Sequence, residues 1–131
     1  MDDDSDSVVR EVWRRWNEGE RELDPELFDP EFTVNSHLTG GTYRGEREIQ
    51  VWISEIDQQF DGWELRVHRT RPLADGRVLV HGSIRGHGRA SGIELDEPAA
   101  WIVALRSGRM LAIHNFIGVE AVKEAEKEAA G

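Results

Sequence analysis

Two stretches of the chain carry hydrophobic residues at the spacing of an amphipathic helix. In residues 7–18 the apolar positions are 8, 9, 12, 13 and 16, and in residues 46–60 the expected buried face consists of positions 49, 52, 53, 56 and 60. Each set lies on one face of a helix. The first helix is predicted to end at Gly19 and the second at Asp61-Gly62.

A third, short helix is predicted between these two. Asp24-Pro25 suits its start, because proline is favoured at the first helical position. Asp29-Pro30 suits its end, because the residue before a proline avoids helical angles.

Most of the remaining chain alternates between apolar and polar residues, which is the pattern of strands with one buried face. Turn residues separate these segments at Ala74-Asp75-Gly76, Ser91-Gly92 and Ser107-Gly108. The expected strands are residues 32–37, 63–68, 77–89, 95–106 and 110–117. One antiparallel sheet that follows mainly helical segments is typical of an α+β domain. Residues after 118 are predicted to form a short helix or a frayed tail.

The two serine–glycine turns predict which side chains share a face of this sheet. If each turn is the centre of a hairpin, Trp101 lies opposite both Gly82 and His114. We expect the resulting face to be concave and covered by the helices. It would carry Trp63, Leu65, Val67, Val80, Gly82, Ile84, Gly86, Glu97, Ala99, Trp101, Val103, Ala112, His114 and Phe116.

Two glycines on this face bear on whether it encloses a pocket. A glycine within a strand marks either a bend or a place of close approach. Gly82 and Gly86 therefore either leave a pocket open beside Trp101 or are covered by the indole of Trp101 itself. The sequence leaves both interpretations open.

The opposite face of the sheet is also partly apolar, and no predicted helix remains to cover it. Exposed apolar patches usually mark interaction sites, so we expect a homodimer packed through this outer face. Its apolar members would be Leu79, Ile102, Ala104, Leu111, Ile113 and Ile117.

Composition narrows the classes of function. The 131 residues are 38% hydrophobic and 32% charged, which is typical of a globular chain. We expect one domain at residues 7–122, a disordered acidic tail at 1–6 and a helical or frayed tail at 123–131. A net charge of −10 argues against nucleic acid and anionic membranes as partners. The chain has no cysteine and begins with an acidic segment rather than a signal peptide, so a cytoplasmic protein is expected.

A family resemblance rests on the run GHGRASGIELDEPAAWIVALRSGRM, on Tyr43-Arg44-Gly45, and on the order helix, short helix, strand and helix before it. Over residues 8–122 the chain resembles the SnoaL-like branch of the nuclear transport factor 2-like superfamily. The resemblance implies a cystatin-like conical barrel, in which a curved antiparallel sheet wraps around a long helix and encloses a pocket. It also implies frequent dimerisation through the outer sheet face. The superfamily includes polyketide cyclases, ketosteroid isomerase, scytalone dehydratase, limonene epoxide hydrolase and non-catalytic binding domains, so it does not choose a function.

Several catalytic patterns of that superfamily are missing from this sequence. Val34-Asn35-Ser36-His37 has no carboxylate where ketosteroid isomerase-like enzymes carry their base. The predicted inner face lacks the Asp-Arg-Asp set of epoxide hydrolases. Phe116-Ile117-Gly118 replaces the Tyr-x-Asp that ends the last strand in many SnoaL-like relatives.

The remaining candidates for chemistry are few. His114 is predicted to face inward, where an apolar neighbourhood would keep the imidazole neutral and suited to act as a base. His37 or Tyr43, which flank the glycine loop, would be its polar partner. The alternative is that each is an ordinary core or loop residue. The five histidines show no metal-ligand spacing, and no metal or cofactor is predicted.

Two functions remain open. In the first, a small apolar molecule, cyclic or open-chain, binds in a tryptophan-lined pocket. It undergoes acid–base catalysis of isomerase, dehydratase, cyclase or hydrolase type without a cofactor. In the second, the protein is a non-catalytic binding or accessory domain. An open cavity beside His114 would favour the enzyme. The substrate-contacting residues would be Trp13, Trp16, Trp52, Trp63, Glu97, Trp101 and Phe116.

Overall fold

Three helices and a six-stranded sheet make up the computed structural model, which describes residues 2–20, 22–36 and 40–130, with side chains from Ser7 onward. The sheet is curved and unclosed, and the chain is an α+β conical barrel as predicted. In chain order the elements are α1 (Asp2–Asn17), β1 (Phe28–Ser36), β2 (Thr42–Arg44), α2 (Gly45–Gln59), β3 (Phe60–Pro72), β4 (Val78–Gly88), β5 (Glu94–Arg106), β6 (Arg109–Ile117) and α3 (Val119–Ala130). The division into tails and a domain at 7–122 stays a prediction.

The expectation of a wholly antiparallel sheet is wrong. The strand order is β2-β1-β6-β5-β4-β3, and β1 runs parallel to β6. Every other neighbouring pair is antiparallel. No turn links β1 to β6, so the hairpin turns that predicted the other pairings carry no information about this one.

The predicted short helix at 24–29 is also wrong, because the chain makes a single turn there and then enters β1. Leu27 and Phe28 both donate their backbone N–H to the carbonyl of Asp24 at 2.9 Å. The carbonyl of Leu27 then accepts from the backbone N–H of Met110 at 2.7 Å. Pairing with β6 therefore begins at Leu27 and Phe28, before a second helical turn can form.

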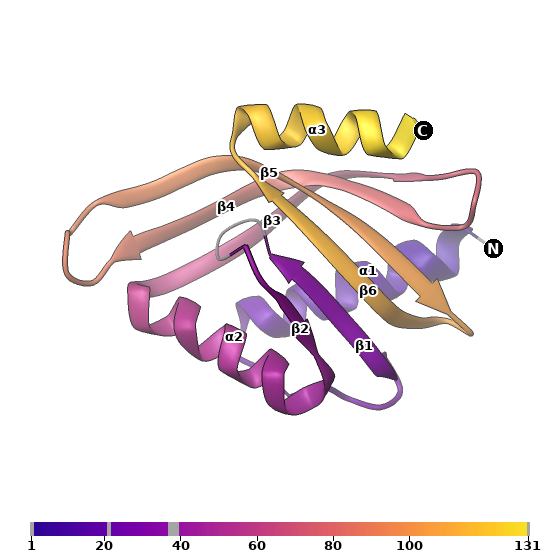
Figure 1. Ribbon diagram of the computed structural model, residues 1–131, viewed down its shortest axis with the longest axis horizontal. Coiled ribbons are helices and arrows are strands. Elements are labelled where there is room, and N and C mark those ends of the chain that lie inside the picture. Colours follow the sequence, from indigo (N-terminus) through magenta and orange to yellow (C-terminus); the bar gives the residue numbers. More distant parts are fainter. Residues whose placement is uncertain (1, 21, 37–39, 131) are drawn as a thin grey trace.

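Helices α1 and α2 lie on one side of the sheet and α3 on the other (Figure 1). The side that faces α1 and α2 holds the main core, which contains all five tryptophans. Asn17 fastens the end of α1 to the edge strand β3, because its side-chain amide donates to the carbonyl of Leu65 at 2.7 Å and accepts from the Leu65 N–H at 2.8 Å. No helix among the described residues is long and apolar enough to cross a membrane.

One β-bulge reverses the predicted orientation of most of β6. Leu105 pairs with Met110, as the turn predicted, but Ala104 pairs with Ala112, so Leu111 is an extra residue in β6. Beyond this point every side chain of β6 points to the face opposite to the one expected, since the side-chain period of a strand is two. Trp101 consequently pairs with Asn115 rather than His114.

The pairing of β4 with β5 is offset by two residues from the predicted register, which leaves the faces unchanged. Gly82 pairs with Ala99, and Val80 pairs with Trp101. The same offset applies to β3, where Leu65 pairs with Ile84. A shift of two residues preserves the alternation, whereas the shift of one in β6 does not.

Helix α3 covers part of the outer sheet face, so the expectation that no helix covers that face is wrong. Ala121 and Ala125 pack with residues of β4, β5 and β6 in a second, smaller core. Glu126 lies 2.6 Å from Nε2 of His81 on β4 and 3.1 Å from the guanidinium of Arg71 on β3. The sheet residues of this second core are Leu79, Ala100, Ile102 and Phe116.

Candidate functional site

The predicted tryptophans come together in one aromatic cluster between the helices and the sheet. Trp13 and Trp16, one turn apart on α1, stack with ring centroids 5.7 Å apart. Trp13 meets Trp101 of β5 edge to face at 5.4 Å, and Trp16 meets Trp52 of α2 at 6.2 Å. Trp63 of β3 is 8% exposed and belongs to the same core. Aromatic pairs at these distances stabilise the core beyond the burial of their area.

A small cavity, which we call the Trp cavity, lies within this cluster. Its volume is about 20 Å³, enough for one water molecule and far below the several hundred Å³ of an ordinary ligand pocket. Ile117 is half-buried, whereas the other lining residues are buried, so Ile117 is the lining residue most exposed to solvent. It is lined by Trp16, Trp52, Ile56, Trp63, Leu65, Ile84, Trp101, Ile113, Asn115 and Ile117.

Three buried indole N–H groups of the cluster donate to no acceptor among the described residues. They belong to Trp13, Trp16 and Trp52, which are 2%, 2% and 4% exposed. By contrast, the indole of Trp63 donates to Oδ1 of Asp57 at 2.6 Å. Most buried polar groups are hydrogen-bonded, and each one left without a partner costs about 1–3 kcal/mol. Trp16 and Trp52 both line the cavity.

Sequence reasoning missed Asn115, the one polar side chain in the described lining of the cavity that is not an indole. It is 4% exposed and pairs across the sheet with Trp101 and, in the parallel direction, with Ser36. Its inward position follows from the bulge at Leu111. The bulge leaves no local signal in this sequence, because residues 110–113 are all apolar and do not show which of them face inward.

The expected inward orientation of His114 and Phe116 is wrong. Their rings lie 4.1 Å apart on the outer face. Phe116 packs in the smaller core beneath α3, and Nδ1 of His114 is 3.7 Å from Oε2 of Glu128 on that helix. His114 therefore has no contact with the Trp cavity, and the geometry does not support it as a base acting there.

The other predicted site residues lie at the margins. The Tyr43 hydroxyl donates to Glu55 at 3.3 Å, and its ring centroid is 6.2 Å from that of Trp52, yet it does not line the cavity. Glu97 is exposed and pairs with Ile84. His37 lies outside the described residues. Within the described part of the chain no group of three or more His, Asp or Glu side chains could hold a metal ion.

Close packing accounts for both glycines of the inner face. A Cβ built on Gly82 would overlap the carbonyl oxygen of Arg66 and lie 3.2 Å from the Trp101 ring. A Cβ on Gly86 would lie 3.3 Å from the Phe60 ring. The interpretation in which Trp101 covers Gly82 is therefore the one that the structure supports.

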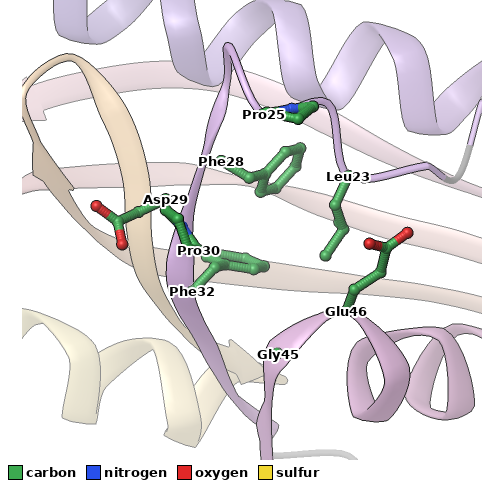
Figure 2. A pocket seen from close by; sticks show the side chains of 8 residues that line it. All are labelled: Leu23, Pro25, Phe28, Asp29, Pro30, Phe32, Gly45 and Glu46. Atoms are coloured by element: carbon green, nitrogen blue, oxygen red, sulfur yellow. The ribbon is translucent and has the colours of Figure 1, made fainter.

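A second hollow, which we call the β1 pocket, opens on the surface where the segment after α1, the start of β1 and the start of α2 meet (Figure 2). Its volume is about 300 Å³. Nearby, the carboxylate of Asp29 accepts hydrogen bonds from Arg106 at 2.8 and 3.0 Å. This guanidinium, helped by the backbone N–H of Glu31, lowers the pKa of the Asp29 carboxyl. The pocket is lined by Leu23, Pro25, Phe28, Asp29, Pro30, Phe32, Gly45 and Glu46.

Comparison with known proteins identifies a matching family and solved structures of similar fold. A family model described as the SnoaL-like domain matches residues 9–113. Among solved structures, a protein from Jannaschia sp. described as a SnoaL-like polyketide cyclase shares 20% identity, with 93% of this chain and 90% of that chain covered and a TM-score of 0.76. An NTF2-like protein of unknown function from Burkholderia pseudomallei shares 14% identity, with coverage of 94% and 95% and a TM-score of 0.76. A protein from Xanthomonas campestris pv. campestris described as a polyketide cyclase shares 13% identity, with coverage of 98% and 96% and a TM-score of 0.78. No curated protein matches the chain.

Proposed function

Because the chain belongs to the family of SnoaL-like domains, we propose that it binds a small, largely apolar molecule with a hydrogen-bond acceptor in the Trp cavity. The carrying observation is that Trp16 and Trp52, which both line the cavity, have buried indole N–H groups without an acceptor among the described residues. A carbonyl or ether oxygen would satisfy these donors, while the aromatic walls would hold the rest of the molecule.

Binding must enlarge the cavity, because 20 Å³ does not admit an organic molecule. Ile117 is the least buried lining residue, so we infer that the ligand enters there. The two unpaired indole donors favour this opening, since their hydrogen bonds to a ligand offset part of the packing that is lost.

The proposed role is binding without catalysis. None of the ten side chains that line the cavity is a carboxylate, histidine, lysine or tyrosine. General acid–base catalysis needs such a group within hydrogen-bond reach of the reacting atoms. Two of the similar structures are described as polyketide cyclases, but the described lining of this cavity offers no residue of this kind.

A matched pair of probes tests this proposal: 1-tetralone has a carbonyl acceptor, and tetralin has the same ring system without it. The indole N–H signals in ¹H–¹⁵N correlation spectra report binding at each tryptophan. We expect 1-tetralone to bind about 3–10 times more tightly than tetralin, the value of one net hydrogen bond. Equal affinities, or no shift of the Trp16 and Trp52 signals, would contradict the proposal.

Two variants locate the donor. Trp52→Phe keeps an aromatic ring but removes an N–H group at the cavity, so the preference for 1-tetralone should shrink. Trp13→Phe is the matched control, because it removes a buried N–H group of the same cluster that does not line the cavity. Recovery of 1-tetralone unchanged in mass and chromatographic retention is expected from a binding protein.

The predicted homodimer and the cytoplasmic location stay predictions. Because α3 already covers part of the outer sheet face, a dimer through that face would have to include α3 or use the part of the sheet beyond it. Light scattering on the purified chain measures the oligomeric state directly.

A further inference from the structure

The β1 pocket is separate from the Trp cavity and already has the volume of a small-ligand site. The two share no lining residue. Phe28 stands between them, with its ring stacked on Trp16 at 6.1 Å. At about 300 Å³ the β1 pocket reaches the lower end of the range for small-molecule sites.

Aromatic and aliphatic side chains form the inside of this pocket. Phe28 and Phe32 meet edge to face with centroids 4.9 Å apart. In Figure 2 both rings and the side chain of Leu23 point toward the same space, whereas the carboxylate of Asp29 points away from it. The charge of Asp29 is in any case balanced by Arg106. The wall therefore accepts an apolar body of modest size.

The mouth of the pocket is acidic. Glu46, at the first turn of α2, lies beside Leu23 in Figure 2 and forms no ion pair with another described residue. An adjoining groove shares Leu23, Pro25 and Glu46 with the pocket. Four carboxylates and one guanidinium line that groove, namely Glu20, Glu22, Asp24, Glu46 and Arg15.

The single guanidinium of the groove does not neutralise this mouth. Arg15 lies 2.9 Å from Asp24, 2.8 Å from Glu11 and 3.9 Å from Glu20, so its charge is shared among three carboxylates. The local excess of negative charge adds to the net charge of −10 of the whole chain. Such a field attracts cations and repels anions.

We propose that the β1 pocket binds a small organic ammonium ion with an apolar body. The ammonium group would lie at the mouth beside Glu46, and the body would pack against Leu23, Phe28 and Phe32. A cation within about 6 Å of an aromatic ring is attracted by the ring as well as by the carboxylate. A neutral molecule of the same shape would be stabilised only by the apolar contact. A carboxylate would bind more weakly still, because the acidic mouth repels it.

Three probes of nearly equal size separate these contributions: benzyltrimethylammonium, neopentylbenzene, which is its neutral counterpart, and phenylacetate. Titration followed by ¹H–¹⁵N correlation spectra should show the cation shifting the backbone signals of Leu23, Phe28, Phe32, Gly45 and Glu46. We expect the cation to bind at least threefold more tightly than the neutral probe and phenylacetate not to bind. A higher salt concentration should weaken the binding of the cation, because salt screens the exposed carboxylates.

Two substitutions that each remove one negative charge test whether the carboxylate at the mouth of the β1 pocket contributes to binding. Glu46→Gln should reduce the affinity for benzyltrimethylammonium about threefold. Glu26→Gln is the matched control, since Glu26 is exposed, lies nearby in sequence and does not line the pocket. Equal binding of cation and neutral probe, equal effects of the two substitutions, or shifts confined to the indole signals of the Trp cavity would each overturn the proposal. Trp52→Phe should leave this binding unchanged, which separates the outcome from that of the Trp cavity.

Discussion

Replacement of Gly82 by alanine tests the close packing that closes the inner face of the sheet. The added methyl group would overlap the carbonyl oxygen of Arg66 and lie 2.8 Å from its carbonyl carbon, whereas ordinary contacts begin at 3.4 Å. Both atoms are backbone of the neighbouring strand β3, at the register shift between Val67 and Arg69. They cannot rotate away as a side chain would, so β3 and β4 must separate locally.

The cost follows from what this separation breaks. Forcing a methyl group into a packed site costs about 1–3 kcal/mol, and each backbone hydrogen bond lost adds about 1 kcal/mol. Alanine regains about 0.4–1 kcal/mol by reducing the freedom of the unfolded chain. We expect Gly82→Ala to lower the free energy of unfolding by about 2–3 kcal/mol and the melting temperature by about 10 °C.

Gly86→Ala is the matched control on the same strand and face. Its methyl group would lie 3.3 Å from the Phe60 ring, which can shift by a few tenths of an ångström, and 3.4 Å from the Cβ of Trp63, which is an ordinary contact distance. Its free energy of unfolding should remain within about 1 kcal/mol of the wild type. Urea denaturation of the three proteins measures the difference. Equal stability of the two variants would refute the reasoning.

Two further predictions concern the ties that hold the elements in place. Asn17→Ala removes both hydrogen bonds to Leu65 and should lower the free energy of unfolding, measured by urea denaturation, by about 1–2 kcal/mol. Asn35→Ala is the control: it removes an exposed hydrogen bond to Thr42 and should cost less than about 0.5 kcal/mol. Asp29 has a lowered pKa in the folded protein because of Arg106, so its contribution to stability is present above its unfolded pKa of about 3.8 and is lost as the pH falls through the folded value. Urea midpoints at pH 7 and pH 3 should therefore differ less for Asp29→Asn than for the wild type, and an equal difference would show that the pair with Arg106 does not contribute.

The face of the sheet on which each side chain lies was predicted correctly for some strands and wrongly for β6. For β3, β4 and most of β5 the turns and the alternation together placed Leu65, Ile84 and Trp101 on the inner face, and the structure confirms these positions. The pairing partners were two residues away from those expected, but an even offset does not change the face. The same reasoning failed in β6, because one extra residue reverses every position beyond it.

The candidate site was predictable only as far as it consists of large apolar side chains. Burial of the five tryptophans was predictable, because each has a large apolar side chain. Side chains that are buried in one core necessarily lie close together. The polar part was not predictable in this way. His114 and Asn115 are neighbours in sequence, and whichever of them faces inward depends on the bulge at Leu111.

The sequence alone determined the faces of α1 and α2, the positions of the hairpins and the burial of the tryptophans, because these depend on local periodicity and side-chain size. The tertiary structure decided the parallel pairing of β1 with β6, the reversal of β6 and the docking of α3 on the outer face. These features depend on contacts between segments far apart in the chain, and no local pattern specifies them. The physical reason is the two-residue period of a strand, which lets a single inserted residue exchange a histidine for an asparagine at the cavity.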